Sequence, residues 1–290
     1  MTVRLVAGSV EAVVDPIAGG RLASLVVGGR QRLITRPDPD APLPSISWGS
    51  FPMIPWVGRM ADGHLAWRGT SFDLPRNLGG HAIHGLTFEQ PWRLAASDDR
   101  SVELVCDLGP GGWPFPGEAR QMIALEADAI TFTIDVRAEA AMPVAVGWHP
   151  WFRREPGEPV SVTVPADEVL ETSEDLIPSG RTIPVDGPTD LREPSDLGTR
   201  WLDHAYVGLD GPCVVRWPDL RLTIEAAPLG SILVHATPRA FCVEPQTSWP
   251  DAIRLAASGR PTGLVQLEAR ETLEATSRWS WAEKAAVQTP

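Results

Sequence analysis

Short runs in which apolar and polar residues alternate recur along the whole chain. Clear examples are residues 22–27, 101–106 and 130–136, each bounded by residues that favour turns. A period of two residues is typical of β-strands that bury one face. The same pattern predicts strands at residues 9–14, 92–96, 121–126, 213–217, 220–226, 263–269 and 272–281.

Turn signals between these runs predict an antiparallel arrangement, because residues 98–100 and 127–129 each join two predicted strands as a hairpin. Helical periodicity is sparse and predicts only a short turn at residues 250–257. Residues 171–197 are rich in Pro, Asp, Ser and Gly, which predicts a long surface loop, with a linker between domains as the alternative. We therefore predict an all-β fold, a large antiparallel β-sandwich that forms a single domain over residues 1–290.

Composition and charge narrow the class of partner. The formal net charge is −12, from 25 Lys+Arg and 37 Asp+Glu, which excludes nucleic acid because its binding needs a basic face. No apolar stretch of about 18 residues could span a membrane, and the first residues lack the apolar core of a signal peptide. Three widely spaced cysteines, Cys106, Cys213 and Cys242, argue against a disulfide framework or a structural zinc site. We expect a cytoplasmic protein with no membrane partner.

Missing motifs exclude several kinds of catalysis. There is no P-loop motif, and the one lysine, Lys284, lies near the C-terminus. No G-x-S-x-G follows a predicted strand, and no G-x-G-x-x-G opens a βαβ unit. What remains is acid/base chemistry by His and Glu on a neutral polar substrate.

Histidines in two unusual segments are the first candidates. His81 and His84 lie in a glycine-framed segment, residues 79–85, where backbone can approach a ligand closely. They are candidates for hydrogen bonds to a ligand, with a structural loop role or a metal pair as the alternatives. His149 lies among Trp148, Trp151 and Phe152, so partial desolvation would shift its pKa. The alternative is a core histidine bonded to backbone, with the aromatic residues packed in the core rather than stacked on a sugar.

Three charged residues complete the candidate set. Glu244 ends an apolar run, where a carboxylate is costly to bury unless paired. A raised pKa would suit it to proton transfer near neutral pH, whereas a solvent-facing strand end is the alternative. Asp203 can accept hydrogen bonds from hydroxyl groups, although an Asx turn explains it equally well. Arg59 follows a long apolar segment and can hold a carboxylate or sugar oxygens.

Taken together, these segments resemble the aldose 1-epimerase (galactose mutarotase) family. The match covers residues 15–280 and follows the family's order with Gly58-Arg59, His84-Gly85, His149-Pro150-Trp151-Phe152, Leu202-Asp203-His204, Glu244-Pro245-Gln246 and Pro250-Asp251-Ala252. The resemblance implies the family's "supersandwich" fold and the interconversion of α and β anomers of a free hexose or related aldose. It implies no cofactor and no metal.

The resemblance also implies a role for each matched residue. Glu244 corresponds to the catalytic base and His149 to the catalytic acid. His84, Arg59 and Asp203 correspond to residues that hold the sugar, and we expect the same of His81, Trp151 and Gln246. Trp151 stands where the family usually has Tyr, His81 stands where it often has Asn, and Trp249 is expected near the sugar, so these three positions bear on which sugar fits.

Three alternatives remain beside this hypothesis. Arg153 and Arg154 beside the His149 segment keep open a hexose-6-phosphate 1-epimerase, although adjacent strand residues face opposite ways, so at most one would reach a pocket. A sugar-binding protein without catalysis would lack the acid or the base. A metal-dependent enzyme would use His81, His84 and His149. We expect a small-molecule sugar as the partner, and a monomer or homodimer.

Overall fold

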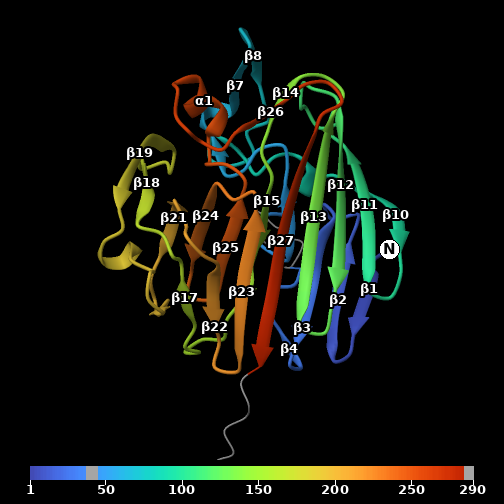
Figure 1. The fold of residues 1–290 in the computed structure, drawn as a ribbon, viewed down its shortest axis with the longest axis vertical. Helices are drawn as coiled ribbons and strands as arrows, with labels where there is room; N and C mark the ends of the chain where they lie inside the picture. The colour runs from blue at the N-terminus through green and yellow to red at the C-terminus, as the bar shows by residue number, and fades with distance from the viewer. Residues whose placement is uncertain (37–44, 284–290) are drawn as a thin grey trace, which may run out of the picture.

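The computed structural model describes residues 1–36 and 45–283 of the chain. Its strands form two large antiparallel sheets of twelve and nine strands, together with three two-stranded sheets (Figure 1). The predicted all-β, antiparallel architecture is therefore confirmed. The hairpins predicted around residues 98–100 and 127–129 are also present, because the strands on either side of each turn pair antiparallel.

Four of the eight candidate site residues, His149, Asp203, Glu244 and Gln246, lie on strands of the twelve-stranded sheet. Its hydrogen-bonded order is β1 (Val3–Ala7), β2 (Val10–Asp15), β3 (Arg21–Val27), β5 (Ser50–Met53), β15 (Gly147–Pro150), β25 (Ala240–Gln246), β24 (Ser231–Ala236), β21 (Leu202–Val207), β18 (Glu168–Thr172) and β19 (Pro178–Pro184). Two short strands join from the side, β4 (Arg30–Gln31) on β3 and β16 (Phe152–Arg153) on β25. Strands far apart in the sequence therefore meet at the centre of this sheet.

The nine-stranded sheet is built mostly from neighbouring hairpins. Its order is β10 (Arg93–Ser97), β11 (Ser101–Asp107), β12 (Gly117–Leu125), β13 (Ala129–Ala138), β27 (Thr272–Glu283), β23 (Leu220–Ala227), β22 (Cys213–Arg216), β17 (Ser161–Thr163) and β20 (Ser195–Asp196). The C-terminal strand β27 lies between β13 and β23, so it joins the two halves of the sheet.

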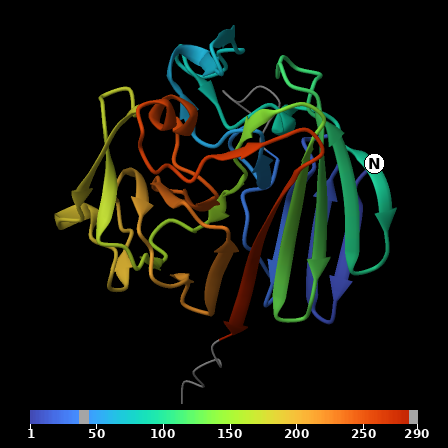
Figure 2. The ribbon, with the colours of Figure 1, turned by 45° about the horizontal axis from the view of Figure 1, so that its top comes forward.

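Short elements complete the described chain. The small sheets are β6 (Arg59–Met60) with β9 (Ala82–Ile83), β7 (His64–Trp67) with β8 (Thr70–Asp73), and β14 (Met142–Val144) with β26 (Val265–Leu267). The helices are the 3-10 turns η1 (Ala61–Gly63), η2 (Thr87–Glu89) and η3 (Gly187–Thr189), and the α-helix α1 (Ala252–Ala257). The β7–β8 hairpin and α1 lie beyond one end of the large sheets, at the top of Figure 1 and toward the viewer in Figure 2.

The hydrophobic core lies between the two large sheets. Alternate residues are buried along the strands, such as Ala12 and Val14 of β2 and Phe132 and Ile134 of β13, and all four belong to one cluster of buried side chains. Burying a valine, isoleucine or phenylalanine side chain contributes about 1.5–3 kcal/mol. The alternation that predicted the strands is thus the pattern that forms the sandwich.

One prediction about this architecture is wrong. Residues 171–197, expected to form a long surface loop, contain the end of β18, all of β19, η3 and β20. Pro178, Gly180 and Pro184 obscured the strand pattern of β19. They are tolerated there because β19 is the outermost strand of its sheet and pairs with β18 alone.

Three further observations concern membrane-spanning helices, the cysteines and the lysine. No helix within the described residues is long and apolar enough to cross a membrane. Cys106, Cys213 and Cys242 are buried with free thiols. Lys284 lies outside the described residues.

Candidate active site

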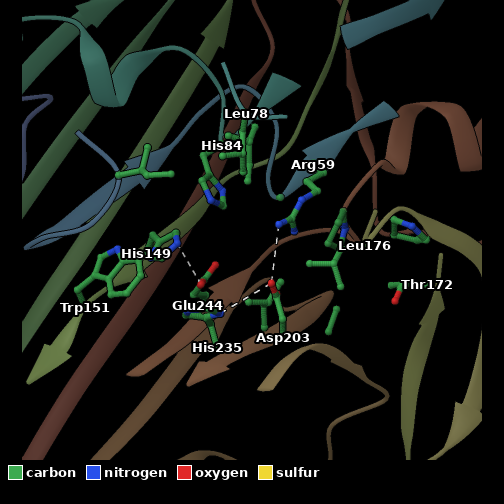
Figure 3. Close-up of a pocket in the computed structure, with 17 residues that line it drawn as sticks. Arg59, Leu78, His84, His149, Trp151, Thr172, Leu176, Asp203, His235 and Glu244 are labelled. Atoms are coloured by element: carbon green, nitrogen blue, oxygen red, sulfur yellow. Dashed lines mark ion pairs between the residues drawn. The ribbon is translucent and has the colours of Figure 1, made fainter. Parts of the chain in front are cut away.

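A cavity of about 230 Å³ opens over the central strands of the twelve-stranded sheet (Figure 3). Six of the eight site residues predicted from sequence line it, and His81 and Gln246 do not. The lining residues are Ile46, Gly58, Arg59, Leu78, Ile83, His84, His149, Trp151, Thr172, Leu176, Pro178, Asp203, Ala205, Leu233, His235, Glu244 and Pro250.

Glu244 lies on β25, a strand in which every residue is buried. Its Oε2 accepts a hydrogen bond from Gln246 Nε2 at 3.2 Å, whereas its Oε1 has no hydrogen-bond partner among the described residues. Burial raises the pKa of Glu244 well above its ordinary value, and the nearby Asp203 carboxylate raises it further. A buried carboxylate oxygen without a partner, in the wall of a cavity, is suited to receive a donor from a ligand.

His149 lies on β15, directly across from Phe51 of β5. Its ring stacks on Phe51 at a centroid distance of 4.8 Å and on Trp151 at 5.3 Å, so aromatic packing sets its orientation. Burial lowers the pKa of His149 well below its ordinary value, and the neighbouring His84 and His235 add to this. The ring is therefore neutral near pH 7 when the pocket holds no ligand.

The carboxylate and the imidazole face each other across two strands. Strands β15 and β25 pair at Gly147 and Gln246, and two residues further along each strand stand His149 and Glu244. Their Nε2 and Oε1 atoms are 3.2 Å apart, close but not aligned as a hydrogen bond (Figure 3). The sheet register itself therefore brings together an acid/base pair from distant parts of the sequence.

His84 is held by an unusual backbone conformation. Its φ is +63°, and its N–H donates to the Gly58 carbonyl oxygen at 3.0 Å. The next residue, Gly85, has φ +76°, and a Cβ there would lie 2.0 Å from the Ile54 carbonyl oxygen, so only glycine fits. Burial, with a smaller effect of Arg59, lowers the pKa of His84 to about 3, and a neutral imidazole results.

Asp203 lies between two nitrogen donors. Arg59 Nη2 and His235 Nδ1 are each 3.8 Å from its Oδ2 (Figure 3). Both distances exceed the length of a hydrogen bond, so these groups keep donor and acceptor capacity for a ligand. Such a set of donors and acceptors suits the hydroxyl groups of a sugar.

His235 is a site residue that the sequence analysis missed. It lies on β24 directly across from Asp203 of β21 and edge-on to Trp151, at a ring distance of 5.5 Å. The available signal was a lone histidine in the otherwise apolar or small segment Ser231–Ala236. That signal is weak, because its pairing with Asp203 depends on the strand register.

His81 and Gln246, which were predicted to contact the sugar, lie outside the cavity lining, and so does Trp249. His81 Nδ1 accepts a hydrogen bond from the Asp62 backbone N–H at 3.0 Å, and this bond gives the ring a structural role. Gln246 does not line the cavity, and its side chain donates a hydrogen bond to Glu244. Trp249 lines a narrow crevice beside α1 instead. Trp151 does line the cavity, where it packs against His149.

The donor set of the cavity fits a metal ion poorly. The ligand atoms of His149, Cys242 and Glu244 lie within 4.8 Å of one another. Burial, however, raises the pKa of the Cys242 thiol well above its ordinary value, and metal binding needs the thiolate. The metal ligands considered from the sequence, His81, His84 and His149, are also separated, because His81 does not line the cavity.

The fold and this site define a class of protein: a two-sheet antiparallel β-sandwich that sets a buried carboxylate against a buried imidazole beside a group of polar side chains suited to hydroxyls. The family model described as aldose 1-epimerase matches residues 1–279. The chain therefore belongs to the aldose 1-epimerase family, and the resemblance recognised from the motifs is confirmed.

Similar proteins agree with this assignment. The uncharacterised Escherichia coli protein YphB is 24% identical over 80% of this chain and 83% of its own length. The galactose mutarotase of Mus musculus is 30% identical over 53% of this chain and 48% of its own. Among solved structures, a galactose mutarotase-like protein from Clostridium acetobutylicum superposes with a TM-score of 0.84 at 17% identity, over 98% of this chain and 95% of that one.

Proposed function

We propose that this protein is an aldose 1-epimerase that interconverts the α and β anomers of an unphosphorylated aldose. The observation that carries the proposal is the 3.2 Å approach of Glu244 Oε1 and His149 Nε2 in a cavity of about 230 Å³. Glu244 is the general base and His149 the general acid. Membership of the family and likeness to the mouse galactose mutarotase support the same reaction.

The reaction needs two proton transfers and no change in oxidation state. Glu244 takes the proton from the C1 hydroxyl while His149 donates one to the ring oxygen O5. The C5–O5H group then departs as the C1 aldehyde forms. Rotation about C1–C2 presents the other face, and closure of the ring reverses both transfers. A well-placed acid or base each contributes about 10²–10⁴-fold to the rate.

Burial also affects which of two proton states the pair prefers. The pair can hold its one proton in two states. In the first the proton is on His149, as glutamate with imidazolium. In the second it is on Glu244, as glutamic acid with neutral imidazole. The first state starts ring opening and the second follows it. In water the ion pair would be strongly preferred, but burial disfavours both charges. Burial therefore favours the uncharged state, and in this proposal hydrogen bonds from the sugar to Glu244 help to form the ion pair that starts ring opening.

Four other groups hold the sugar in this proposal. Arg59 and His235 donate to ring hydroxyls, and Asp203 accepts from them. His84 is neutral, with an Nδ1 that lacks a partner among the described residues, so it can bond to a sugar oxygen without competing for the catalytic proton. Fixed partners of this kind hold the anomeric centre against Glu244 and His149.

The cavity favours a free aldose over a hexose 6-phosphate. Arg59 is the one lysine or arginine among its described lining residues, and Asp203 stands 3.8 Å away. Arg153 and Arg154 do not line it. Arg153 is exposed and bonded to Glu155, and buried Arg154 donates to three backbone carbonyls. A phosphate dianion would therefore find little positive charge.

The first test is polarimetry of freshly dissolved α-D-glucose and α-D-galactose, with and without enzyme. We expect enzyme-dependent acceleration that Glu244→Gln lowers by about 10²–10⁴-fold, because glutamine cannot accept the proton. Glu274→Gln, which changes an exposed carboxylate on β27, is the matched control and should keep full activity. Unchanged turnover in Glu244→Gln would contradict the assignment.

Thermal melting distinguishes lost chemistry from lost folding in that variant. Burial raises the pKa of Glu244, so the folded protein loses stability as pH rises through this pKa. Glutamine has no such titration. Glu244→Gln should therefore melt at or above the wild-type temperature at neutral and higher pH.

A further inference from the structure

Four neighbouring strands of the twelve-stranded sheet contribute one side chain each to a row that ends at the proposed acid/base pair. Strands β3, β5, β15 and β25 are consecutive in the hydrogen-bonded order of the sheet. Phe51 of β5 pairs with His149 of β15, and Arg21 of β3 directly precedes the residue that pairs β3 with β5. Cross-strand neighbours share one face of a sheet. The row therefore crosses the sheet in the order Arg21, Phe51, His149 and Glu244.

Arg21, at the start of this row, is a buried cation bonded to backbone. It is 1% exposed, and burial lowers its pKa to about 10, so the side chain is still charged near pH 7. Its Nε donates to the Ala18 carbonyl oxygen, its Nη1 to that of Trp48 at 3.0 Å, and its Nη2 to that of Phe88 at 3.1 Å. An apolar side chain would fill this space without the cost of burying a charge. The planar fork instead joins three separate segments of the chain.

The guanidinium of Arg21 also packs against aromatic rings. Its central carbon lies 4.2 Å from the ring centroid of Trp48 and 5.1 Å from that of Phe51. Phe51 in turn stacks on His149, with ring centroids 4.8 Å apart and 27° between the planes. Gly49 leaves room for this arrangement, because a Cβ there would lie 3.3 Å from Arg21 Cδ. The guanidinium and the imidazole therefore pack on Phe51 from the two strands that flank β5.

We propose that Arg21 is a positioning residue for the proposed catalytic acid, and that it acts by holding Phe51 in place against the His149 ring. The inference rests on the proposed epimerase function and adds a residue that does not line the cavity. His149 Nδ1 has no hydrogen-bond partner among the described residues, so ring packing has to hold the imidazole. A displacement of about 1 Å at a reacting group can lower a rate about 10²-fold.

Two substitutions of Arg21 test the proposal by polarimetry, with kcat and KM measured on an aldose that the wild type accelerates. Arg21→Met removes the planar fork and the charge, whereas Arg21→Lys keeps the charge without the fork. We expect kcat to fall about tenfold or more in both variants and KM to stay within about twofold, because Arg21 touches no sugar in the proposal.

Arg154→Met is the matched control for these variants. Arg154 is also buried and also donates to three backbone carbonyl oxygens, but it is not part of the row. Arg154→Met should lower the melting temperature about as much as Arg21→Met and keep kcat within about twofold of the wild type. Equal kcat in the variants Arg21→Met and Arg154→Met would overturn the proposal, because Arg21 would then be only a structural anchor. Recovery of kcat in Arg21→Lys would also overturn it, because charge alone would then suffice.

A double variant tests whether Arg21 acts through Phe51. Phe51→Leu should lower kcat by itself, because it removes the ring on which His149 stacks. In the double variant with Arg21→Met, kcat should fall no more than about twofold below that of the slower single variant, because both substitutions disturb one contact. Losses of kcat that multiply would overturn the action through Phe51.

Crystal structures of the two Arg21 variants test the positioning without an activity assay. We expect the distance between His149 Nε2 and Glu244 Oε1, 3.2 Å in the wild type, to change by about 0.5 Å or more. An unchanged distance in both variants would overturn the proposal. A wild-type protein that accelerates no aldose would instead count against the epimerase function, while the crystal structures would still decide whether Arg21 positions the His149 ring. The two failures are therefore distinguishable.

Discussion

At the scale of single residues, burial disfavours the charged forms of the two side chains at the centre of the site. Glu244 and His149 are both buried, and each has a pKa displaced toward its uncharged form. Hydrogen bonds that would offset this burial are missing at Glu244 Oε1 and at His149 Nδ1 within the described residues. The pair therefore keeps its capacity for interaction available to a substrate.

The pH dependence of the reaction follows from these displaced pKa values. Burial lowers the pKa of His149 from 6.5 and raises that of Glu244 from 4.5. In the proposed mechanism Glu244 and His149 share one proton. His149 takes up a second proton only below pH 6.5, because burial lowers its pKa. Glu244 loses the shared proton only well above pH 4.5, because burial raises its pKa. Groups with ordinary pKa values would confine activity to about pH 4.5–6.5.

We therefore expect kcat/KM to keep its maximum above about pH 6.5, where groups with ordinary pKa values would already have lost activity. The measurement is a profile from about pH 4 to 10 with a neutral aldose, corrected at each pH for spontaneous mutarotation. A narrow maximum near about pH 5.5, with decline above about pH 6.5, would show that burial does not shift the pair.

Single residues also show how far sequence reasoning reaches. Glu244, His149, Arg59, His84, Asp203 and Trp151 were predicted from motifs and do line the cavity, while their roles stay predictions. His235 was missed because its place beside Asp203 arises only when β21 and β24 pair. His81 was expected at the sugar, yet its ring accepts the Asp62 N–H instead, a local bond that no motif reveals.

At the scale of elements, close backbone packing positions the loop that carries His84. Gly85 approaches the Ile54 backbone so closely that a Cβ would lie 2.0 Å from its carbonyl oxygen. The same oxygen accepts a hydrogen bond from the Leu86 N–H at 2.9 Å. The segment after β9 is thus anchored to the segment after β5.

Gly85→Ala should displace this anchor and His84 with it. We expect a loss of about 3 kcal/mol or more in the free energy of unfolding, measured by urea denaturation, together with reduced kcat/KM. Gly79→Ala is the matched control, because Gly79 also has a positive φ, +57°, but has no atom within 4 Å of a Cβ. It should lose only about 1–2 kcal/mol. Equal losses in the two variants would mean that backbone strain, rather than the contact with Ile54, sets the cost.

Elements with regular alternation were the most predictable part of the fold. Residues 22–27 and 130–136 lie inside β3 and β13, and the short turn predicted at residues 250–257 contains the helix α1. Strand β19 was mistaken for loop because proline and glycine interrupt it, and an edge strand tolerates both. The order of strands in the sheets could not be predicted from the sequence, because paired strands such as β15 and β25 are far apart along the chain.

At the scale of the whole molecule, net charge affects which substrates arrive. A charge of −12 repels anions at long range, whereas it exerts no force on a neutral aldose. Arg59 is the one lysine or arginine of the described cavity lining, and the Asp203 carboxylate 3.8 Å away offsets its charge, which acts in the same direction.

Ionic strength therefore separates neutral from phosphorylated substrates. We expect kcat/KM for a neutral aldose to stay constant between about 0.01 and 0.5 M salt. Glucose 6-phosphate should react more slowly than the neutral sugar, and its kcat/KM should rise with salt as the repulsion is screened. A phosphate ester that reacts fastest at low salt would contradict this and favour a hexose-6-phosphate 1-epimerase.

The meeting of β15 and β25 at the centre of the sheet has a consequence for how such an enzyme can be divided. Arg59, His84 and His149 precede the exposed turn at Gly157, whereas Asp203 and Glu244 follow it. A polypeptide cleaved at this turn would yield two fragments, one with the proposed acid and one with the proposed base. By the proposed mechanism, neither could transfer both protons alone. Mutarotation recovered on mixing would then report that the fragments had reassembled.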